Sequence, residues 1–332
     1  MTETELMRHA LRLSLKYKYT AKPNPTVGAL IYDGSTIIAE GAHEKYGSKH
    51  AEINCLDALA QNKSRPNLSE LTLYCTLEPC NHAGKTGPCT EAIIKSGIKN
   101  VVIGCIDPNP IVAGKGIKKL TQSGINVSVG VIEEEIKTSS KFFFKHEQKR
   151  PFICIKIATS KDGKSHKNYQ FEWITSEGSR ADVQELRAEF DCILTGGNTV
   201  RADNPRMSAR VPFAVNQPKR ILFSKKNNWN KELNFFANDN FEIIDATNVG
   251  ELIRKINEQD ISSILVEAGP DLVSLLIEEN FCDELIAYEA QKVLGDEYTD
   301  WFEDKLFLDK NGFQLKSNYT IGSDIKRVYK KC

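Results

Sequence analysis

Apolar positions along the first 150 residues switch repeatedly between helical and strand spacing. Leu6, Ala10, Leu13 and Tyr17 recur every three or four residues, which predicts an opening amphipathic helix. Asp33-Gly34 predicts a hairpin turn between two strands, Ser48 a helix N-cap and Gly97 a helix end. The elements predicted in order are strands 27–32 and 36–40, helix 50–61, strand 71–76, helix 88–96, strand 100–105, helix 116–123, strand 126–130 and a charged helix ending at residue 144.

The second half of the chain restarts the same alternation. Its predicted elements are strand 152–158, helix 177–190 and strands 192–195, 221–223, 264–267 and 285–288. A polar stretch over residues 145–150, followed by Pro151, is typical of a domain boundary. With 332 residues, about twice the usual ~150 per domain, the chain is predicted to form two α/β domains, residues 1–147 and 148–332, each with helices covering its strands.

The amino-acid composition argues against several classes of protein function. The 44 basic and 44 acidic residues cancel, which argues against a nucleic-acid partner and favours a small-molecule substrate. Residues 1–15 lack the pattern of a signal peptide, and no apolar run approaches the ~20 residues of a membrane span, so we expect no membrane partner. Nine scattered cysteines indicate a reducing, cytoplasmic setting. Homo-oligomerisation is left open by the sequence.

The strongest chemical signal is His50-Ala51-Glu52 followed by Glu78-Pro79-Cys80 and Pro88-Cys89. One imidazole and two thiolates hold zinc while leaving a fourth position for water, whose pKa the metal lowers toward ~7. Glu52, two residues beyond His50, is placed to shuttle protons without being a ligand. Cys89 is predicted at a helix N-terminus, where the backbone dipole favours a thiolate.

The order of these residues is that of the zinc nucleobase deaminases, with His-x-Glu before Pro-Cys and a second cysteine. Eight residues, rather than two, separate Cys80 from Cys89 here. Two other interpretations exist for the same residues. In one, these residues are ordinary core side chains; in the other, His82 is a fourth ligand that completes a closed, structural zinc site.

Longer motifs extend the likeness along the chain. The segments at 22–28, 50–52, 76–89 and 107–110, with Gly114 and Gly116, resemble the deaminase half of the bifunctional riboflavin-biosynthesis deaminase/reductase. Segments 156–164, 173–175, 199–206, 267–270 and 294–295, with Arg187, resemble its reductase half. The resemblance implies a cytidine-deaminase-like three-layer α/β domain followed by a dihydrofolate-reductase-like α/β domain.

What the family implies is a two-step path on one pyrimidine ribotide, 2,5-diamino-6-(5-phosphoribosylamino)pyrimidin-4-one. Zinc-dependent hydrolysis removes a ring amino group, and NADPH then reduces the ribosyl group to ribityl. By position, His50, Cys80 and Cys89 match the zinc ligands and Glu52 the catalytic proton shuttle. Asn24 matches the loop that holds the substrate.

The reductase half lacks a Gly-x-Gly-x-x-Gly fingerprint, in agreement with a cofactor site that is not of the Rossmann type. Positions that match substrate contacts are Arg187, Met207, Arg210 and Glu267. An arginine suits the ribose phosphate because its planar fork binds two oxygens. The alternative for Arg187 is a surface residue that pairs with a neighbour such as Asp191. Positions that match cofactor contacts are Ala158, Trp173, Thr199, Asp203, Ser224, Gly269, Pro270, Asp271, Leu272, Val273, Ser274 and Leu275.

The sequence departs from the family around the loop before Trp173. Phe171 stands where a small hydroxyl residue is usual, residues 166–170 lack the usual glycine, Lys161 replaces an apolar residue and Gly87 replaces a proline. Two further interpretations therefore remain beside the bifunctional enzyme. One is a deaminase whose second half has lost or changed its reductase role; the other is a nucleic-acid-editing deaminase, against which the zero net charge counts.

Overall fold

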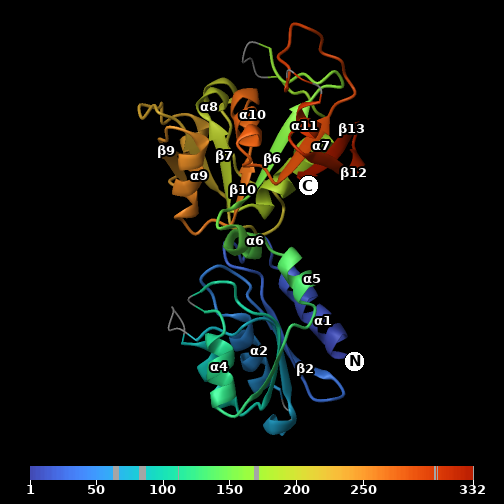
Figure 1. Ribbon diagram of the computed structural model, residues 1–332, viewed down its shortest axis with the longest axis vertical. Coiled ribbons are helices and arrows are strands. Elements are labelled where there is room, and N and C mark those ends of the chain that lie inside the picture. Colours follow the sequence, from blue (N-terminus) through green and yellow to red (C-terminus); the bar gives the residue numbers. More distant parts are fainter. Residues whose placement is uncertain are drawn as a thin grey trace. The chain divides into compact units, whose positions relative to one another are not determined.

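The computed structural model describes residues 1–62, 67–81, 87–110, 112–167, 172–302, 304 and 306–331. The chain divides into two compact units, Met1–Gln148 and Lys149–Cys332, each with its own sheet (Figure 1). None of the helices in these described segments combines the length and the apolar character needed to cross a bilayer.

The first unit is built on a five-stranded sheet of order β2-β1-β3-β4-β5. Strand β1 pairs antiparallel with β2 and β3, whereas β3, β4 and β5 run parallel. The elements are α1 (Glu3–Leu15), β1 (Gly28–Tyr32), β2 (Ile37–Ala42), α2 (Ala51–Ala60), β3 (Thr72–Leu77), α3 (Cys89–Ser96), β4 (Asn100–Cys105), α4 (Lys115–Gln122), β5 (Asn126–Val129), α5 (Glu133–Thr138) and α6 (Lys141–Gln148).

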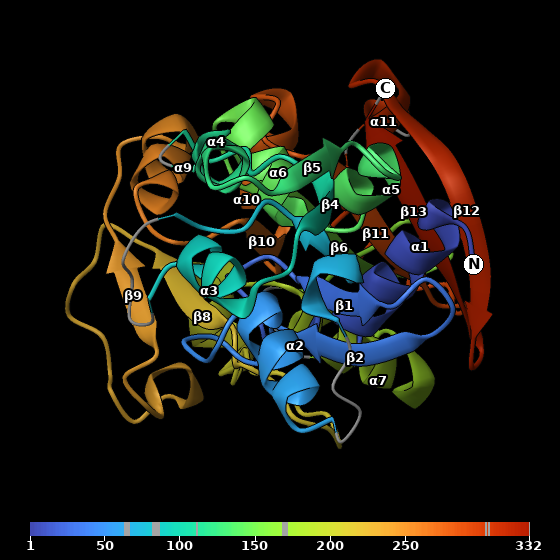
Figure 2. The same cartoon turned by 90° about the horizontal axis from the view of Figure 1, so that it is seen from below.

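Helices cover both faces of this sheet (Figures 1 and 2). Alternate residues of the strands point to opposite sides, so Leu73 packs with α2, α3 and α4 while Tyr74 packs with α1, α5 and α6. The predicted hairpin is confirmed, since Asp33 Oδ1 accepts from the amides of Ser35 and Thr36 at 2.8 and 2.7 Å. The three layers bring the starts of α2 and α3 to the same side of the sheet.

Several predicted details of the first unit are wrong. The buried face of α1 comprises Leu6, Met7, Ala10, Leu11 and Ser14, so Leu13 and Tyr17 lie off it. Ser48 bonds to Lys45 instead of capping α2, whose N-cap is His50. The charged helix near residue 140 is two helices, and the second, α6, includes residues 145–148 of the predicted linker.

The second unit holds an eight-stranded sheet of order β12-β13-β11-β6-β10-β7-β8-β9. The strands from β11 to β9 in this order are parallel to one another, and β13 and β12 add an antiparallel hairpin at one edge. The elements are β6 (Phe152–Thr159), α7 (Glu177–Glu189), β7 (Cys192–Gly196), α8 (Gly197–Asp203), β8 (Lys219–Phe223), β9 (Phe241–Ile244), α9 (Val249–Asn257), β10 (Ser263–Val266), α10 (Pro270–Glu278), β11 (Glu284–Glu289), α11 (Phe307–Lys310), β12 (Phe313–Ile321) and β13 (Asp324–Lys331).

The parallel strands of this sheet are nearly continuous apolar runs because both of their faces are buried. Helices α9 and α10 cover one face and α7 and α8 the other. The C-terminal hairpin was not predicted, since its strands are mostly polar, with β12 exposed and β13 half-buried. Because the central strands β6, β7 and β10 are parallel, their carboxyl ends lie side by side, and the second candidate site lies at these ends.

Candidate active sites

The first site lies where one strand end and two helix starts of the first unit meet. His50 is the N-cap of α2, and Cys89 is the first residue of α3, directly after Pro88. Cys80 follows the end of β3 and is tied to α3, because its carbonyl accepts from the Thr90 amide at 3.2 Å. The fold thus brings together the three residues that the sequence predicts as zinc ligands.

The geometry of these three side chains fits one zinc ion. Nδ1 of His50 lies 3.5 Å from Cys80 Sγ and 3.3 Å from Cys89 Sγ. Zn–N and Zn–S bonds of ordinary length in a tetrahedral site put nitrogen and sulfur about 3.6 Å apart. The three ligand atoms lie within 4.8 Å of one another, and His82, the alternative fourth ligand, lies outside the described residues.

The electrostatics of the site favour a thiolate at Cys80. A hydrogen bond from the Cys89 thiol, together with donors at His50 and the Cys89 amide, lowers the pKa of Cys80 to about 4 despite its burial. The bond to Cys80 raises the pKa of His50. A thiolate and an imidazole so close together are suited to a divalent cation of borderline softness.

Glu52 lies beside the ligands but outside the ligand group. It is 3% exposed in the first turn of α2 and shares a hydrogen bond with the Cys89 thiol. Burial raises the pKa of Glu52 to about 7, a value at which a carboxyl group both accepts and donates protons near neutrality. This placement suits the predicted role of proton shuttle.

A histidine that the sequence analysis missed joins Asn24 to the site. The Asn24 amide nitrogen lies 3.1 Å from His43 Nε2, and His43 Nδ1 lies 3.1 Å from the Lys49 carbonyl. Because a carbonyl only accepts, Nδ1 donates and Nε2 accepts from Asn24, so His43 is neutral. Burial correspondingly lowers the pKa of His43, whose ring stands edge-on to His50 at 5.7 Å. Its position directly after a strand, seven residues before His50, was the available signal.

Glu78 holds the loop beside the zinc ligands in place. Its carboxylate accepts from four backbone amides at 2.8–3.3 Å, those of Asp107, Gly114, Gly116 and Ile117. A Cβ on Gly116 would lie 2.1 Å from the Pro79 carbonyl oxygen, so only glycine allows this close approach. Asp107, Gly114 and Gly116, which belong to the family motifs quoted above, are thereby held close to the segment that carries Cys80.

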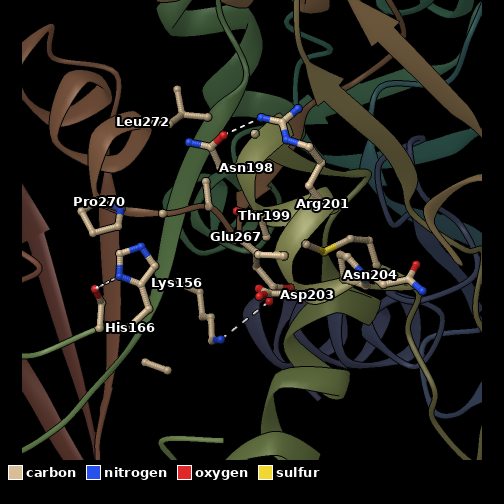
Figure 3. Close-up of a pocket in the computed structure, with 18 of the residues that line it drawn as sticks. Lys156, His166, Asn198, Thr199, Arg201, Asp203, Asn204, Glu267, Pro270 and Leu272 are labelled. Atoms are coloured by element: carbon tan, nitrogen blue, oxygen red, sulfur yellow. Dashed lines mark hydrogen bonds and ion pairs between the residues drawn. The ribbon is translucent and has the colours of Figure 1, made fainter. Parts of the chain in front are cut away.

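The second site is a cavity of about 1260 Å³ at the carboxyl edge of the parallel strands of the second unit. Figure 3 shows side chains from β6, α8 and the start of α10 that point into it. All the predicted reductase residues line this cavity except Val273 and Ser274. Val273 is buried in the core that α10 shares with the sheet, because it lies on the opposite side of that helix.

Arg187 forms a buried ion pair with Glu267 and none with Asp191, the neighbour considered in the sequence analysis. Its Nε and Nη2 contact the two carboxylate oxygens of Glu267 at 2.5 and 2.9 Å, and Arg187 is 9% exposed. The pairing with Asp191 is wrong, since that carboxylate accepts from the amides of Ser262 and Ser263. The Nε/Nη2 edge of the Arg187 guanidinium is therefore filled by a carboxylate, and its Nη1 donates to the Ser208 carbonyl at 3.3 Å.

Lys156, at the centre of β6, completes this buried cluster and was not among the predicted site residues. Its Nζ lies 3.7 Å from Glu267 Oε2 (Figure 3). Although burial opposes ionisation, the charges of Arg187 and Lys156 hold the pKa of Glu267 at about 2. Burial lowers the pKa of Lys156 and raises that of Asp203. A lysine that interrupts an otherwise apolar strand was the available signal.

The donor groups around the cavity fit an anionic dinucleotide. Helix α10 begins at Pro270 with Gly269 as N-cap and no side-chain cap, so its first amides are available to a diphosphate. Gly269 has open space where a Cβ would stand, which leaves room for that group. Basic side chains on α8 and after β8, namely Arg201, Lys225 and Lys226, line the same cavity. NADPH is thus compatible with the residues present.

Comparison with known proteins gives a family match for each unit. The cytidine and deoxycytidylate deaminase zinc-binding region matches residues 1–105, and the RibD C-terminal domain matches residues 151–327. The riboflavin biosynthesis protein RibD of Actinobacillus pleuropneumoniae is 34% identical, covering 99% of this chain and 95% of its own length. The chain belongs to the RibD family. RibD of Aquifex aeolicus (strain VF5) is 36% identical, with 87% of each chain covered.

Solved RibD structures share the fold. Acinetobacter baumannii RibD, form 1, has a TM-score of 0.90 at 30% identity, covering 99% of this chain and 98% of that chain. A diaminohydroxyphosphoribosylaminopyrimidine deaminase/5-amino-6-(5-phosphoribosylamino)uracil reductase from Thermotoga maritima has a TM-score of 0.84 at 31% identity, with the same coverage. The predicted fold class, a deaminase-like α/β domain followed by a reductase-like one, is confirmed.

Family membership fixes the activities at the level of the whole chain. This RibD protein is a bifunctional enzyme of riboflavin biosynthesis, a zinc-dependent deaminase joined to an NADPH-dependent reductase that acts on a small pyrimidine substrate. The match to the reductase domain, residues 151–327, disfavours the alternative of a deaminase alone. The departure at Phe171 lies outside the described residues.

Proposed function

We propose that residues 1–147 carry out the deamination and residues 148–332 the reduction, on 2,5-diamino-6-(5-phosphoribosylamino)pyrimidin-4-one and its deaminated product. The convergence of His50, Cys80 and Cys89 beside the buried carboxyl group of Glu52 is the observation that carries the first assignment. The substrate follows from the Thermotoga maritima relative, which is named for both reactions.

In the deaminase site, zinc would be held by His50, Cys80 and Cys89. When bound, zinc acidifies a water molecule and so supplies a nucleophile at neutral pH. Glu52, buried beside these ligands, would take up a proton as the nucleophile forms and return a proton to the ring amino group, which would leave as ammonia. Asn24, whose amide is oriented by His43, offers its carbonyl oxygen and remaining N–H to the substrate.

Metal analysis of matched variants tests the zinc assignment. We expect about one zinc per chain in the wild-type protein and a loss of most of it in Cys80→Ser and Cys89→Ser. Cys105→Ser is the control, because it removes a buried thiol of the same unit outside the ligand group. Full zinc content in both ligand variants would refute the assignment.

In the reductase site, the buried cluster of Lys156, Arg187 and Glu267 binds the deaminated ribotide, which is the substrate of the reduction. Glu267, held ionised by Arg187, accepts hydrogen bonds from the pyrimidine N–H groups, and Lys156 directs an ammonium N–H to a substrate oxygen. NADPH would be held by Gly269 and the first turn of α10 with Thr199 and Ser224, and it supplies the hydride.

Two arginines, Arg187 and Arg210, are predicted to contact the substrate. Since Glu267 occupies the Nε/Nη2 edge of Arg187 and the Ser208 carbonyl accepts from its Nη1, we assign the ribose phosphate to Arg210, which lines the same cavity. Burial and the neighbouring charges of Arg187 and Arg206 lower the pKa of Arg210, and the Glu267 carboxylate offsets only part of this effect. Arg210→Ala should raise the KM for the ribotide about tenfold or more and leave ammonia release from the first step unaffected.

We also place the enzyme in the cytoplasm and assign it no nucleic-acid or membrane partner. The cysteines that the structure describes are all free thiols, which suits a reducing compartment. The zero net charge offers no general attraction to a polyanion. Turnover of the free ribotide that does not depend on salt concentration would support the absence of a nucleic-acid partner.

A further inference from the structure

A histidine in the wall of the reductase cavity is not used by the reaction as described above. His166 is the single histidine of the sequence from residue 149 onward, and it lines the cavity together with Lys156 and Pro270. Figure 3 shows its ring between these two residues. Imidazole is the side chain whose charge ordinarily changes between about pH 5 and 8. A group of this kind beside a substrate cluster is suited to proton transfer.

The backbone around His166 is fixed by a second segment of the chain. A tight turn over residues 160–164 sends the chain back after the end of β6. The Thr299 amide then donates to the His166 carbonyl at 2.7 Å, and the Ser165 amide donates to the Thr299 carbonyl at 2.8 Å. The ring of His166 is therefore carried by backbone that is held on both sides of the cavity wall.

Hydrogen bonds also decide which ring nitrogen exchanges a proton. The Ser165 hydroxyl donates to the Thr299 carbonyl at 3.0 Å, which uses its one proton. His166 Nδ1 lies 3.3 Å from the same hydroxyl oxygen, so Nδ1 carries a proton and the oxygen accepts it. Nε2 is then the nitrogen that gains or loses a proton when the imidazole changes its charge.

Charged groups from several elements surround His166. Burial raises the pKa of Asp203, at the end of α8, and the charges of His166 and Lys156 partly offset this effect. An imidazolium at His166 and the Asp203 carboxylate therefore interact across the cavity. The remaining charged groups nearby are Asp271, which lines the cavity at the start of α10, and the pairs Lys164–Asp300 and Lys167–Glu297 on either side of His166 in the sequence.

The cations of the substrate cluster are less suited to give up a proton. Arg187 stays charged at any pH of interest, because a guanidinium does not release its proton in proteins. Lys156 lies 3.7 Å from Glu267, and a neutral Lys156 would weaken the charge balance around that buried carboxylate. His166 has no such carboxylate to neutralise within the substrate cluster, so a change in its charge leaves the cluster intact.

We propose that Nε2–H of the His166 imidazolium donates the proton that the reduction consumes. This inference rests on the proposed assignment of the reductase activity to the second unit. When ribosyl becomes ribityl, the C1′–O4′ bond of the sugar breaks and a C–H bond forms at C1′ with the hydride that NADPH supplies. The electron pair of the broken bond stays on O4′, which takes the proton from Nε2 and becomes a hydroxyl group. The neutral imidazole regains a proton from solvent.

The test follows the reduction alone, over a range of pH. The full-length enzyme would be given NADPH and the deaminated ribotide, and kcat/KM for the ribotide measured by NADPH oxidation from about pH 5 to 9. The wild-type value should fall about tenfold per pH unit on the alkaline side of neutrality, as the imidazolium is lost. In His166→Gln, the value at acid pH should be about 10²-fold lower, and the fall between about pH 6 and 8 should be absent.

Three controls separate proton donation from a structural role. Added imidazole should raise the reduction rate of His166→Ala severalfold, because free imidazolium then donates the proton. The affinity for NADPH, measured by calorimetry, should agree within about twofold between the wild type and His166→Gln. His9→Gln removes a half-exposed histidine of the first unit that pairs with Glu40, and it should keep the wild-type pH profile.

The outcomes distinguish this proposal from the one on which it rests. A wild-type fall with pH in His166→Gln would overturn it, and loss of the fall in Asp203→Asn alone would assign the proton to Asp203. A loss of NADPH affinity of about tenfold in His166→Gln, without rescue of His166→Ala by imidazole, would instead show a binding role and also overturn it. If the wild-type enzyme oxidises no NADPH with the deaminated ribotide at any pH, the reductase assignment itself fails, and the proton donor fails with it.

Discussion

At the scale of single residues, Glu52 separates metal binding from proton transfer. Glu52→Gln keeps the shape of the side chain but cannot carry a proton, so zinc should remain bound while deamination falls by about 10²-fold or more. Ammonia release and zinc content, measured on the same preparation, check both parts. Near-normal deamination with zinc bound would exclude the shuttle role.

Arg187 is expected to act on stability as well as on reduction. Arg187→Ala leaves the Glu267 carboxylate buried beside Lys156 alone, and removing one partner of a buried pair costs about 3–5 kcal/mol. All three tryptophans, Trp173, Trp229 and Trp301, belong to the second unit, so their fluorescence during urea unfolding reports on that unit alone.

The control for this prediction is the triple variant Lys156→Met, Arg187→Met and Glu267→Gln. It removes all three charges of the buried cluster, so it should unfold at a higher urea concentration than Arg187→Ala. Unchanged stability in Arg187→Ala, with only a raised KM for the ribotide, would instead indicate a phosphate contact and contradict the ion pair.

The ionised state of Glu267 gives the second unit a defined acid sensitivity. Its pKa is about 2 in the folded state against 4.5 as the ordinary value, so the carboxylate contributes about 3 kcal/mol that is fully present above pH 4.5. This contribution should be lost as the pH falls from 4.5 toward 2. Tryptophan-detected urea unfolding at a series of pH values measures it, and Glu267→Gln should show a weaker dependence on pH in that range.

At the scale of elements, the end of β4 and the start of α4 are tied together by the single carboxylate of Glu78. Glu78→Ala removes the acceptor of four backbone amides, so we expect it to destabilise the first unit by at least about 2 kcal/mol and to lower deamination. Far-ultraviolet circular dichroism during urea unfolding, with tryptophan fluorescence for the other unit, measures the effect. Glu91→Ala is the control, since that exposed carboxylate of α3 only pairs with Lys119. Equal stability of the two variants would contradict the role given to Glu78.

The helices and strands also show how much of the fold could be predicted from the sequence. Strand β4 has its predicted bounds, 100–105, because a short apolar run between turn signals has one interpretation. The face of α1 was mispredicted, since Leu13 and Tyr17 fit helical spacing as well as Met7 and Leu11 do and only packing against the sheet decides between them. The hairpin of β12 and β13 is mostly polar, with β12 exposed and β13 half-buried, so no apolar alternation marked it.

The zinc ligands of the first site were predicted more completely than the buried charges of the second site, for a physical reason. His50 and Cys89 stand at the starts of helices and Cys80 follows the end of β3, and all three belong to short motifs whose residue types mark a metal site in the sequence. Arg187 and Glu267 are 80 residues apart, and their pairing depends on the packing of α7 against the end of β10. Lys156 and His43 lie outside any short metal-binding pattern, and their neighbours come from other elements.

At the scale of the whole molecule, the two units should fail independently because each has its own core. Removal of zinc with a chelator should abolish ammonia release but leave NADPH oxidation with the deaminated ribotide within about twofold of its original rate. Arg210→Ala should show the reverse pattern. Parallel loss of both activities in either protein would indicate one cooperative unit.

The most direct test of the account is mass analysis of the ribotide after incubation with the purified enzyme, with and without NADPH. Without NADPH, we expect one change, the replacement of a ring amino group by oxygen with release of ammonia. With NADPH, that product should gain two hydrogen atoms while an equal amount of NADPH is consumed. A single change in both incubations, or a hydrogenated product that keeps its amino group, would contradict the assignment of the two reactions and their order.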